Sequence, residues 1–381
     1  MNENDDNNEF ILNDFSSSNL GSHKKIINKK ILIIGSIVFI IILLFIILLI
    51  ILLYNNSKHS NNSPDENKKI LGIISCIYTR TESSSDNIKI IGDAYIKNSK
   101  FDILINGKPI PFTRTYKFPD YNEHKIEYHL YEEINMTEMF KNINSIISVE
   151  MTSNKNALIT SLKSSFENCN NLKSFIIKGF NVEKIRSLEK MFYGTKIKSI
   201  DFNIFNRTKI EDMSYMFASS EIEFFNFFEI DMSNIKNISH LFDNCSSLQR
   251  IEISSKINMN KLEDMSFMFR QCESLIKLNL SNFMQTNNLK DISHSFQNCI
   301  ALKSIDLSNI ITDFVYDMSY MFEGCNSIGI IDISNFDTSN VKNIDSMFKL
   351  CYSLTELKID NNKFNTNNVI KCQICFIIVI H

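Results

Sequence analysis

Proline and glycine are scarce in this chain, which has four prolines and nine glycines in 381 residues. Because both residues mark irregular loops, their scarcity predicts a regular architecture. Basic residues are not in excess either: the formal net charge is −3, and no stripe of Lys or Arg recurs along the sequence. A nucleic-acid partner would need such a basic surface, so we expect none.

Catalytic motifs are also missing. The sequence contains no G-x-S-x-G, no H-E-x-x-H and no glycine-rich phosphate loop. His240 and His294 take a repeated position that other copies fill with Tyr215, Phe267 or Tyr320, which is more typical of a repeat than of a catalytic site. We therefore expect no enzyme, no catalytic residue, no cofactor, no metal site and no small-molecule substrate.

The most informative feature that the sequence does contain is a recurring phenylalanine. It returns at intervals of 25 to 27 residues, at Phe140, Phe166, Phe192, Phe217, Phe242, Phe269, Phe296, Phe322 and Phe348, and Phe376 extends the series by 28. A period of this length predicts a tandem array of one supersecondary unit. Such an array presents a long surface rather than a closed pocket, which favours binding over catalysis.

Each repeat contains two segments, which are clearest in the copy that begins at Asp317. The alternation of Ile331, Asp332 and Ile333 predicts a half-buried strand. The preceding D-M-S-x-M-F segment predicts about two helical turns, because Asp caps helix N-termini and the apolar residues lie three and four apart. We therefore predict an α/β repeat solenoid of the leucine-rich-repeat kind, with a parallel β-sheet on one face and short helices on the other.

The repeated phrase [MS]-F-x-x-C-x-x-[LI]-x-x-[IL]-x-[IL]-S-N-[FI] resembles the BspA-like leucine-rich-repeat surface proteins of bacteria and some microbial eukaryotes. The resemblance covers about residues 133–376. It implies an extracellular or surface-attached protein with a role in adhesion or binding. The sequence departs from standard leucine-rich repeats where their Asn after the last strand is replaced by Phe283, Ile310 or Phe336, which makes the interior more apolar.

A second feature is an apolar run of 23 residues from Ile31 to Leu53. Its helical length of about 35 Å would cross a membrane core of ~30 Å, and it exceeds the ~7–15 apolar residues of a secretory signal. We therefore predict an uncleaved transmembrane signal anchor. Four lysines precede the run, at Lys24, Lys25, Lys29 and Lys30, so the positive-inside rule predicts a cytosolic N-terminus and extracellular repeats at the plasma membrane.

These features predict an order of parts along the chain. A disordered cytosolic tail (1–30) and the anchor (31–53) are followed by a polar stalk (54–69), a small β-rich module (70–132) and about nine to ten repeats (133–376). Residues 377–381 form a short tail, and a truncated chain would explain a last repeat without a cap. The module has strand patterns at 72–78, 88–91, 101–105 and 125–130, and a hairpin signal at Asn106-Gly107. We interpret it as a cap for the first repeat, with an independent ligand-binding domain as the alternative.

Six cysteines lie three residues after the recurring phenylalanine, at Cys169, Cys245, Cys272, Cys299, Cys325 and Cys351. Other copies place Ile143, Thr195 or Ser220 in this position. A position that accepts all four residue types is a small inward slot, so we assign these cysteines to packing. Disulfides between neighbouring repeats are the alternative, since an oxidising compartment would allow them.

Two groups of residues are candidates for the binding surface. The residue between the two apolar positions of each strand points outward, and this column has acidic members at Asp201, Glu252, Asp306 and Asp332. It could attract a basic ligand or a cation, or it could be a solvated polar face. The second group is a hydrophobic patch formed by Phe224 and Phe228, unless Phe224 turns inward to accommodate a shortened copy.

Candidate N-glycosylation sequons fit an extracellular repeat domain; they lie at Asn55, Asn61, Asn135, Asn206, Asn244 and Asn279. The sequence thus predicts a membrane-anchored surface glycoprotein whose solenoid binds an unidentified protein or glycan without catalysis. Two alternatives remain: a cytosol-facing scaffold anchored to a membrane, and a structural coat protein that packs laterally.

Overall fold

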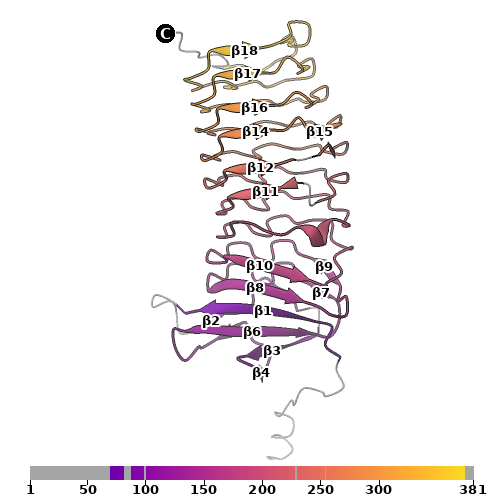
Figure 1. Ribbon diagram of the computed structural model, residues 1–381, viewed down its shortest axis with the longest axis vertical. Helices are drawn as coiled ribbons and strands as arrows, with labels where there is room; N and C mark the ends of the chain where they lie inside the picture. The colour runs from indigo at the N-terminus through magenta and orange to yellow at the C-terminus, as the bar shows by residue number, and fades with distance from the viewer. Residues whose placement is uncertain (1–68, 81–86, 98–99, 228–229, 254, 374–381) are drawn as a thin grey trace, which may run out of the picture. The chain divides into compact units, whose positions relative to one another are not determined.

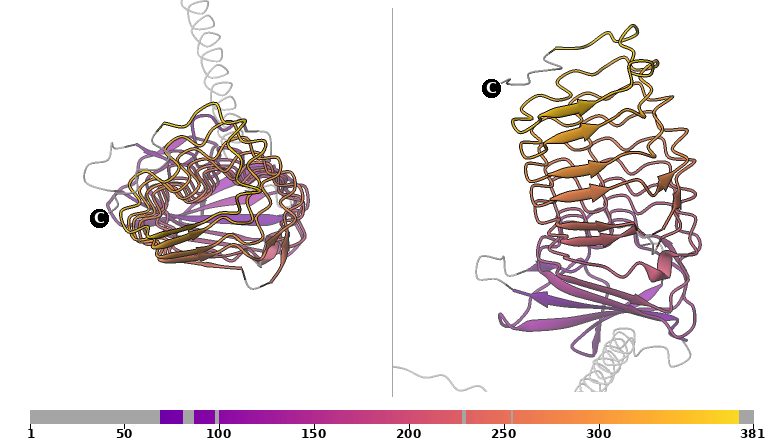
Figure 2. Two further views of the ribbon diagram at one scale, coloured as in Figure 1. Left: turned by 90° about the horizontal axis from the view of Figure 1, so that it is seen from above. Right: turned by 45° about the horizontal axis from the view of Figure 1, so that its top comes forward.

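The computed structural model describes residues 69–80, 87–97, 100–227, 230–253 and 255–373. These residues form a β-solenoid on a small β-sheet cap. We call each repeat of the coil a rung; the rungs stack along one axis from the cap to the last strand (Figure 1). Seen from above, successive rungs superimpose around a common interior (Figure 2).

The elements are short. The cap contains β1 (Gly72–Thr79), β2 (Ile88–Lys89), β3 (Phe101–Ile105), β4 (Lys108–Ile110), β5 (Thr115–Tyr116) and β6 (Glu123–Leu130). The first rungs contain β7 (Ile134–Asn135), β8 (Ile146–Thr152), β9 (Ile159–Ser161) and β10 (Ser174–Lys178). The later rungs contain the 3₁₀ turn η1 (Asn203–Phe205), β11 (Phe224–Asn226), β12 (Arg250–Glu252), β13 (Ile257–Asn258), β14 (Lys277–Asn279), β15 (Phe283–Met284), β16 (Ser304–Asp306), β17 (Ile330–Asp332) and β18 (Glu356–Lys358).

The cap is continuous with the solenoid. One six-stranded sheet has the order β10-β8-β1-β6-β3-β4, in which β8 and β10 are parallel strands of the first rungs and β1 pairs antiparallel with β8. The cap thereby covers the edge of the first rung, whose backbone N–H and C=O groups would otherwise be unpaired. The predicted hairpin joins β3 to β4, with positive φ at Asn106 and Gly107, and Pro109 in β4 discourages further pairing at the outer edge.

The recurring phenylalanines form the centre of the core. All nine from Phe140 to Phe348 are buried, and consecutive rings stack with centroids 5.4–5.9 Å apart and planes within 23° of parallel. The predicted half-buried strands are also confirmed. In β14, for example, Leu278 is buried between exposed Lys277 and Asn279, and the later strands pair in parallel and in register.

The predicted α/β solenoid with short helices is wrong. No α-helix occurs in the described part of the chain, where helical structure is limited to 3₁₀ turns such as η1. In the D-[MI]-S-x-x-F segment, the backbone N–H groups alternate between two kinds of partner. Tyr215 N donates to Ser239 O of the next rung (3.0 Å), whereas Met216 N donates to Met213 O three residues back (3.2 Å). An α-helix would send every N–H to the carbonyl four residues back, so this segment is a series of tight turns.

The residues of the predicted helices explain the correction. Positive φ recurs two residues before and after the phenylalanine, as at Tyr215 (56°) and Ser219 (58°), and no right-handed helix contains such residues. The predicted helix cap makes the expected local bond, since Asp212 Oδ1 accepts a hydrogen bond from Ser214 N (2.9 Å). However, the same bond is also found at the start of an Asx-turn, and in this structure it starts a turn rather than a helix.

The predicted single-pass localisation is corrected as well. The described residues contain no helix that is long and apolar enough to cross a membrane. The predicted tail, the anchor from Ile31 to Leu53 and nearly all of the predicted stalk lie outside the described residues. A protein with an N-terminal transmembrane helix and extracellular repeats is therefore not supported.

The six repeated cysteines are free and buried. Each thiol donates to the carbonyl of the recurring phenylalanine one rung earlier, as from Cys299 Sγ to Phe269 O (3.0 Å). In a copy without cysteine, the Thr195 hydroxyl donates to Phe192 O (2.9 Å). The cysteine is thus a small core residue that also carries a weak hydrogen-bond donor.

Replacing a stacked phenylalanine should strongly destabilise the solenoid. We expect Phe269→Ala to lower the free energy of unfolding by about 3–5 kcal/mol, because a cavity would open between two rungs. Phe314 is the matched control, since its side chain is 62% exposed and its replacement by Ala should change stability by less than about 0.5 kcal/mol. Urea denaturation compares the two; equal effects would contradict the stacked core.

The repeated cysteines should be unreactive in the folded protein. Burial raises the pKa of the Cys299 thiol to about 12, so very little nucleophilic thiolate exists at pH 8. We expect iodoacetamide to alkylate Cys299 only after unfolding in urea, as measured by peptide mass spectrometry. Alkylation of native protein at the rate of an unfolded peptide would contradict this packing.

Candidate binding surface

The predicted outward column is present on the solenoid sheet. Glu252 of β12 pairs in register with Asn226 of β11, Asp306 of β16 pairs with Asn279 of β14, and Asp332 of β17 pairs with Lys358 of β18. These third strand residues are half-buried or exposed. Asp201 is exposed too, but it lies in the rung between β10 and β11 and in no strand.

Most acidic residues of this column have a structural role. Asp332 Oδ1 accepts hydrogen bonds from Ser334 N (3.1 Å) and Ser334 Oγ (2.7 Å). Asp306 and Asp201 each accept the N–H two residues ahead (3.1 and 2.9 Å). The bonds from Ser334 favour the carboxylate and hold the pKa of Asp332 below its ordinary value. These side chains therefore open the turn that follows each strand, and one carboxylate oxygen remains for a ligand.

Phe224 and Arg250 form a pair on the outer face of the sheet. The two residues lie opposite each other in β11 and β12, and the guanidinium carbon is 4.8 Å from the ring centroid. Phe224 is half-buried, whereas Phe225 and Phe227 are buried in the core. Phe228, the second residue of the predicted patch, lies outside the described residues. The described residue of the predicted patch thus forms an aromatic–arginine pair, and the two-phenylalanine patch itself stays a prediction.

Sequence reasoning missed an aromatic column on the turn face. Tyr215, His240, Phe267, His294 and Tyr320 are half-buried and stack nearly parallel, with centroids 4.1–4.6 Å apart. Their shared position in the repeat was visible in the sequence. The stacking was not, because the sequence pattern predicted a short helix where the structure has turns with left-handed residues. Because neighbouring rings cover each other's faces, the column offers ring edges rather than an open stacking surface to a ligand.

Charged side chains pair across rungs beside this column. Arg270 binds both oxygens of Asp243 (2.7 Å each), and His240 Nδ1 lies 2.8 Å from Asp243 Oδ2. Burial alone would raise the pKa of Asp243, but the bonds from His240 and Arg270 outweigh it and lower that pKa. Three rungs after Asp243, Glu323 accepts from Gln297 (2.5 Å) and Lys349 (2.7 Å). These networks link rungs, and they leave buried acids paired.

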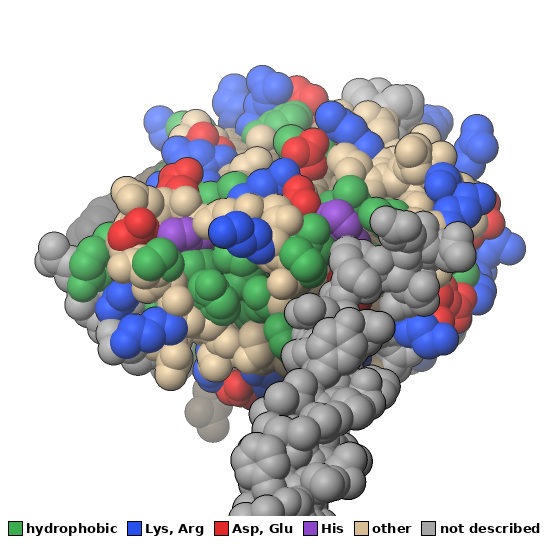
Figure 3. Space-filling view, turned by 90° about the horizontal axis from the view of Figure 1, so that it is seen from below, with side chains coloured by type: hydrophobic (Ala, Val, Ile, Leu, Met, Phe, Trp, Pro, Cys, Tyr) green, Lys and Arg blue, Asp and Glu red, His purple; other side chains and the backbone are tan. Residues whose placement is uncertain are grey.

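The end of the molecule that the cap forms has a different chemistry. Hydrophobic side chains gather on this face with Lys and Arg around them (Figure 3). Ile96, Phe112 and Tyr121 are exposed hydrophobic residues of the cap. The Lys97 ammonium lies 4.5 Å from the Phe112 ring centroid and 5.2 Å from that of Phe101, so cation–π contacts cover part of this aromatic surface.

Sequence comparison places these rungs in a known family. Residues 134–249, 220–305 and 263–378 match the family described as "Mycoplasma protein of unknown function, DUF285". The overlapping matches cover more than half of the chain. The chain belongs to the DUF285 family. No curated protein matches it.

Two solved structures are similar to this DUF285 protein. A leucine-rich cell surface protein from Faecalibacterium prausnitzii A2-165 is 15% identical over 63% of this chain and 83% of its own, with a TM-score of 0.28. A TLR13–ssRNA13 complex is 14% identical over 61% of this chain and 40% of its own, with a TM-score of 0.18. One of these two structures is thus that of a leucine-rich cell surface protein, and the family that matches is DUF285 rather than one named BspA-like.

The Asn side chains of the described sequons in this DUF285 protein differ in the hydrogen bonds that they make. Asn135 Oδ1 accepts from Thr137 N (2.9 Å), Asn244 Nδ2 donates to Ser219 Oγ (3.2 Å), and Asn279 Oδ1 accepts from Ser281 N (2.8 Å). Asn206 is exposed next to η1. Asn55 and Asn61 lie outside the described residues. Glycosylation at any of these positions stays a prediction.

A column of carboxylates near the turn segments brings like charges close together. Asp264, Asp291 and Asp317 follow one another on neighbouring rungs. Burial, and then the charges of Asp264 and Asp317, raise the pKa of Asp291 above its ordinary value. The same position holds Asn237 and Asn343 in other rungs. Like charges on neighbouring rungs thus oppose one another in this column. In the part of the chain that the structure describes, no cluster of His, Cys, Asp and Glu is arranged to hold a metal.

Replacing Asp291 by Asn should therefore stabilise the protein at neutral pH. Asn keeps the turn bond, as Asn237 Oδ1 accepts Ser239 N (2.8 Å), and it removes a like charge, which we expect to gain about 0.5 kcal/mol. The raised pKa of Asp291 means that its ionised form destabilises the folded protein. At a pH below that pKa, Asp291 is protonated and the repulsion is absent. The gain should thus disappear as the pH falls through that pKa. Thermal denaturation between pH 3 and 7 measures it.

Asp332→Asn is the opposite control. The folded-state pKa of Asp332 is lowered, so its carboxylate stabilises the fold above the unfolded pKa and loses this effect as the pH falls through the folded pKa. We expect this variant to be less stable than wild type at pH 7. A destabilised Asp291→Asn at pH 7 would contradict the repulsive column.

Proposed function

We propose that this DUF285 protein is a non-catalytic recognition protein whose solenoid sheet binds a protein or glycan partner. The observation that carries the proposal is the Phe224–Arg250 pair on the outer sheet face. Arginine is enriched among the few residues that dominate the energy of protein interfaces, and phenylalanine is enriched at interfaces in general. A half-buried ring held by a guanidinium is also ordered before binding, which lowers the entropic cost of association.

The charges of the sheet face support a partner without strong net charge. The first strand residues include Arg250 and Lys277, whereas the third residues include Glu252, Asp306 and Asp332. Opposite charges therefore alternate across neighbouring columns, and Arg250 binds Glu252 directly (2.5 Å). Such a face has no field that would attract a polyanion. It suits a partner with mixed polar and apolar groups, and Ile330, which is half exposed, adds apolar area.

The state of the titratable groups supports binding rather than catalysis. His240 and His294 are stacked between aromatic rings, and burial lowers the pKa of His294. The buried carboxylate of Asp243 is held by His240 and by the Arg270 guanidinium. A general acid or base needs a reachable position beside the substrate, and these contacts use the groups for inter-rung bonding instead.

Binding by the sheet face can be tested with purified full-length chain on printed glycans and immobilised matrix proteins. We expect Phe224→Ser and Arg250→Ala each to weaken capture at least about tenfold, the loss typical of an interface hot spot. Phe314→Ser is the matched control, because Phe314 is exposed but lies in a connecting segment outside the sheet strands. Capture that neither sheet variant changes, or the absence of any capture by wild type, would refute the proposal. Ordered self-association of the chain would instead favour the laterally packing coat.

A further inference from the structure

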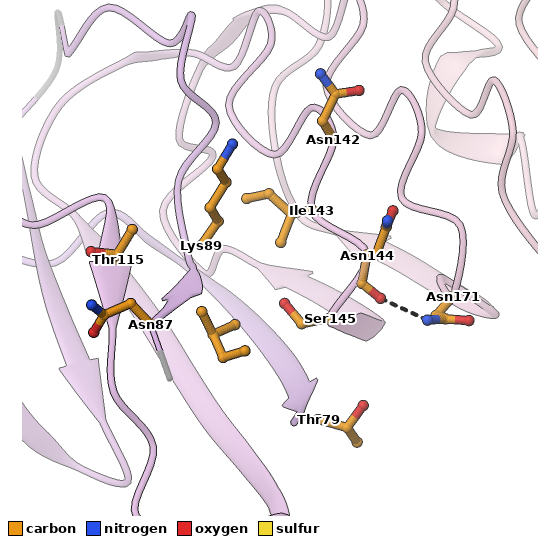
Figure 4. Close-up of a pocket in the computed structure, with 10 residues that line it drawn as sticks. Thr79, Asn87, Lys89, Thr115, Asn142, Ile143, Asn144, Ser145 and Asn171 are labelled. Atoms are coloured by element: carbon orange, nitrogen blue, oxygen red, sulfur yellow. Dashed lines mark hydrogen bonds between the residues drawn. The ribbon is translucent and has the colours of Figure 1, made fainter. Parts of the chain in front are cut away.

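A cleft of about 340 Å³ lies where the cap meets the first two rungs. Its lining comes from five separate segments, with Thr79 at the end of β1, Lys89 in β2, Thr115 in β5, Asn144 in the first rung and Asn171 in the second (Figure 4). The Asn171 amide donates to the backbone carbonyl of Asn144 (2.9 Å), which fixes this wall. The volume falls at the lower end of the ~300–1,000 Å³ found for small-ligand sites.

The cleft offers hydrogen-bonding groups that the protein leaves unused. Within the described residues, Asn144 Nδ2 and the hydroxyls of Thr79 and Thr115 have no hydrogen-bond partner. Beneath them, Ile88 and Ile143 also line the cleft and are 5% and 1% exposed. The accessible lining therefore consists mainly of neutral amide and hydroxyl groups, above two apolar side chains that are nearly buried.

The charges of the cleft disfavour an ionic ligand. Among its described lining residues, Lys89 is the one cationic side chain, and it is paired with Asp93 at 2.5 Å. The same described residues include no Asp or Glu. An anion would have to compete with Asp93 for the ammonium, and a cation would find no carboxylate among these residues. A neutral ligand fits this balance best.

The backbone around the cleft disfavours an extended peptide. Thr79 N already donates to Ser145 O (2.9 Å), and Lys89 of β2 is paired with Thr115 of β5. A peptide that adds a strand needs a free sheet edge with alternating N–H and C=O groups, and these pairs occupy the backbone at the rim. Side-chain amides and hydroxyls from several directions instead match a ring that carries hydroxyl groups around its edge.

We propose that this cleft binds a neutral pyranose residue of a glycan. The sugar hydroxyls bond to Asn144, Thr79 and Thr115, and the ring lies over the nearly buried side chains of Ile88 and Ile143. This inference rests on the proposed recognition function, because it assigns glycan binding to the cap junction and leaves the sheet face for the rest of the partner.

Saturation-transfer NMR with the full-length chain tests the inference, using glucose, galactose, mannose and N-acetylglucosamine as free probes. We expect transfer to at least one sugar. Thr79→Val with Thr115→Val keeps the side-chain shape and removes two hydroxyls, so the affinity should fall about tenfold, from two hydrogen bonds of ~0.5–1.5 kcal/mol each. Asn144→Ala is a second variant with the same expected direction. Asn203→Ala, at an exposed position in η1, should retain wild-type binding.

The outcomes separate this inference from the proposed function. The sugar site is overturned if no sugar receives saturation from the wild-type protein, or if both cleft variants give the same signal as wild type. Either result counts even if Phe224 still controls capture of a larger partner. Displacement by a neutral peptide without any sugar signal also overturns it and assigns the cleft to peptides. Sugar binding that only the cleft variants lose supports the inference even if no macromolecule binds the sheet. Phe224→Ser should leave the sugar signal unchanged.

Discussion

The hydrogen bonds between rungs are the interaction on which the rest of the structure depends. In each turn segment, alternate backbone N–H groups donate to carbonyls of the next rung instead of closing a helix. This pairing sets the separation of the rungs, and the separation brings equivalent side chains into direct contact. The phenylalanine stack, the thiol-to-carbonyl bonds and the left-handed residues on each side of the phenylalanine all follow from it. The conformational cost of ~1–2 kcal/mol for each left-handed residue is offset by these contacts.

Because equivalent residues of neighbouring rungs lie in contact, some residue types stabilise the stack and others destabilise it. Threonine suits the arrangement, since Thr312 both donates to Asp337 O (2.9 Å) and accepts from Asp337 N (2.8 Å) in the next rung. Aromatic rings also suit it, since equivalent rings stack nearly parallel on neighbouring rungs. Charges need variation between rungs: Asp243 is followed by Arg270 and gains a bidentate pair, whereas Asp291 between two other aspartates has a raised pKa. Small departures from strict repetition therefore relieve electrostatic strain.

We place recognition where the repeat pattern is broken, because the repeated positions already serve the contacts between rungs. The acidic sheet column illustrates this: its carboxylates open the following turns. The Phe224–Arg250 pair and the cleft at the cap are not repeated from rung to rung. The cap is also where antiparallel and parallel strands join in one sheet, so its surface differs from that of the rungs.

The sequence by itself determined the period, the buried phenylalanine, the outward strand column and the hairpin of the cap. These features depend on local alternation and spacing, which survive in any fold that buries one side of each repeat. It did not distinguish helix from turn, because Asp212 makes the same bond to the N–H of Ser214 in both. Only the tertiary structure decided that choice, through carbonyls of the neighbouring rung that lie some 25 residues away. The cleft likewise depends on contacts between residues as distant as Thr79 and Asn171, and no local pattern records which distant segments will meet.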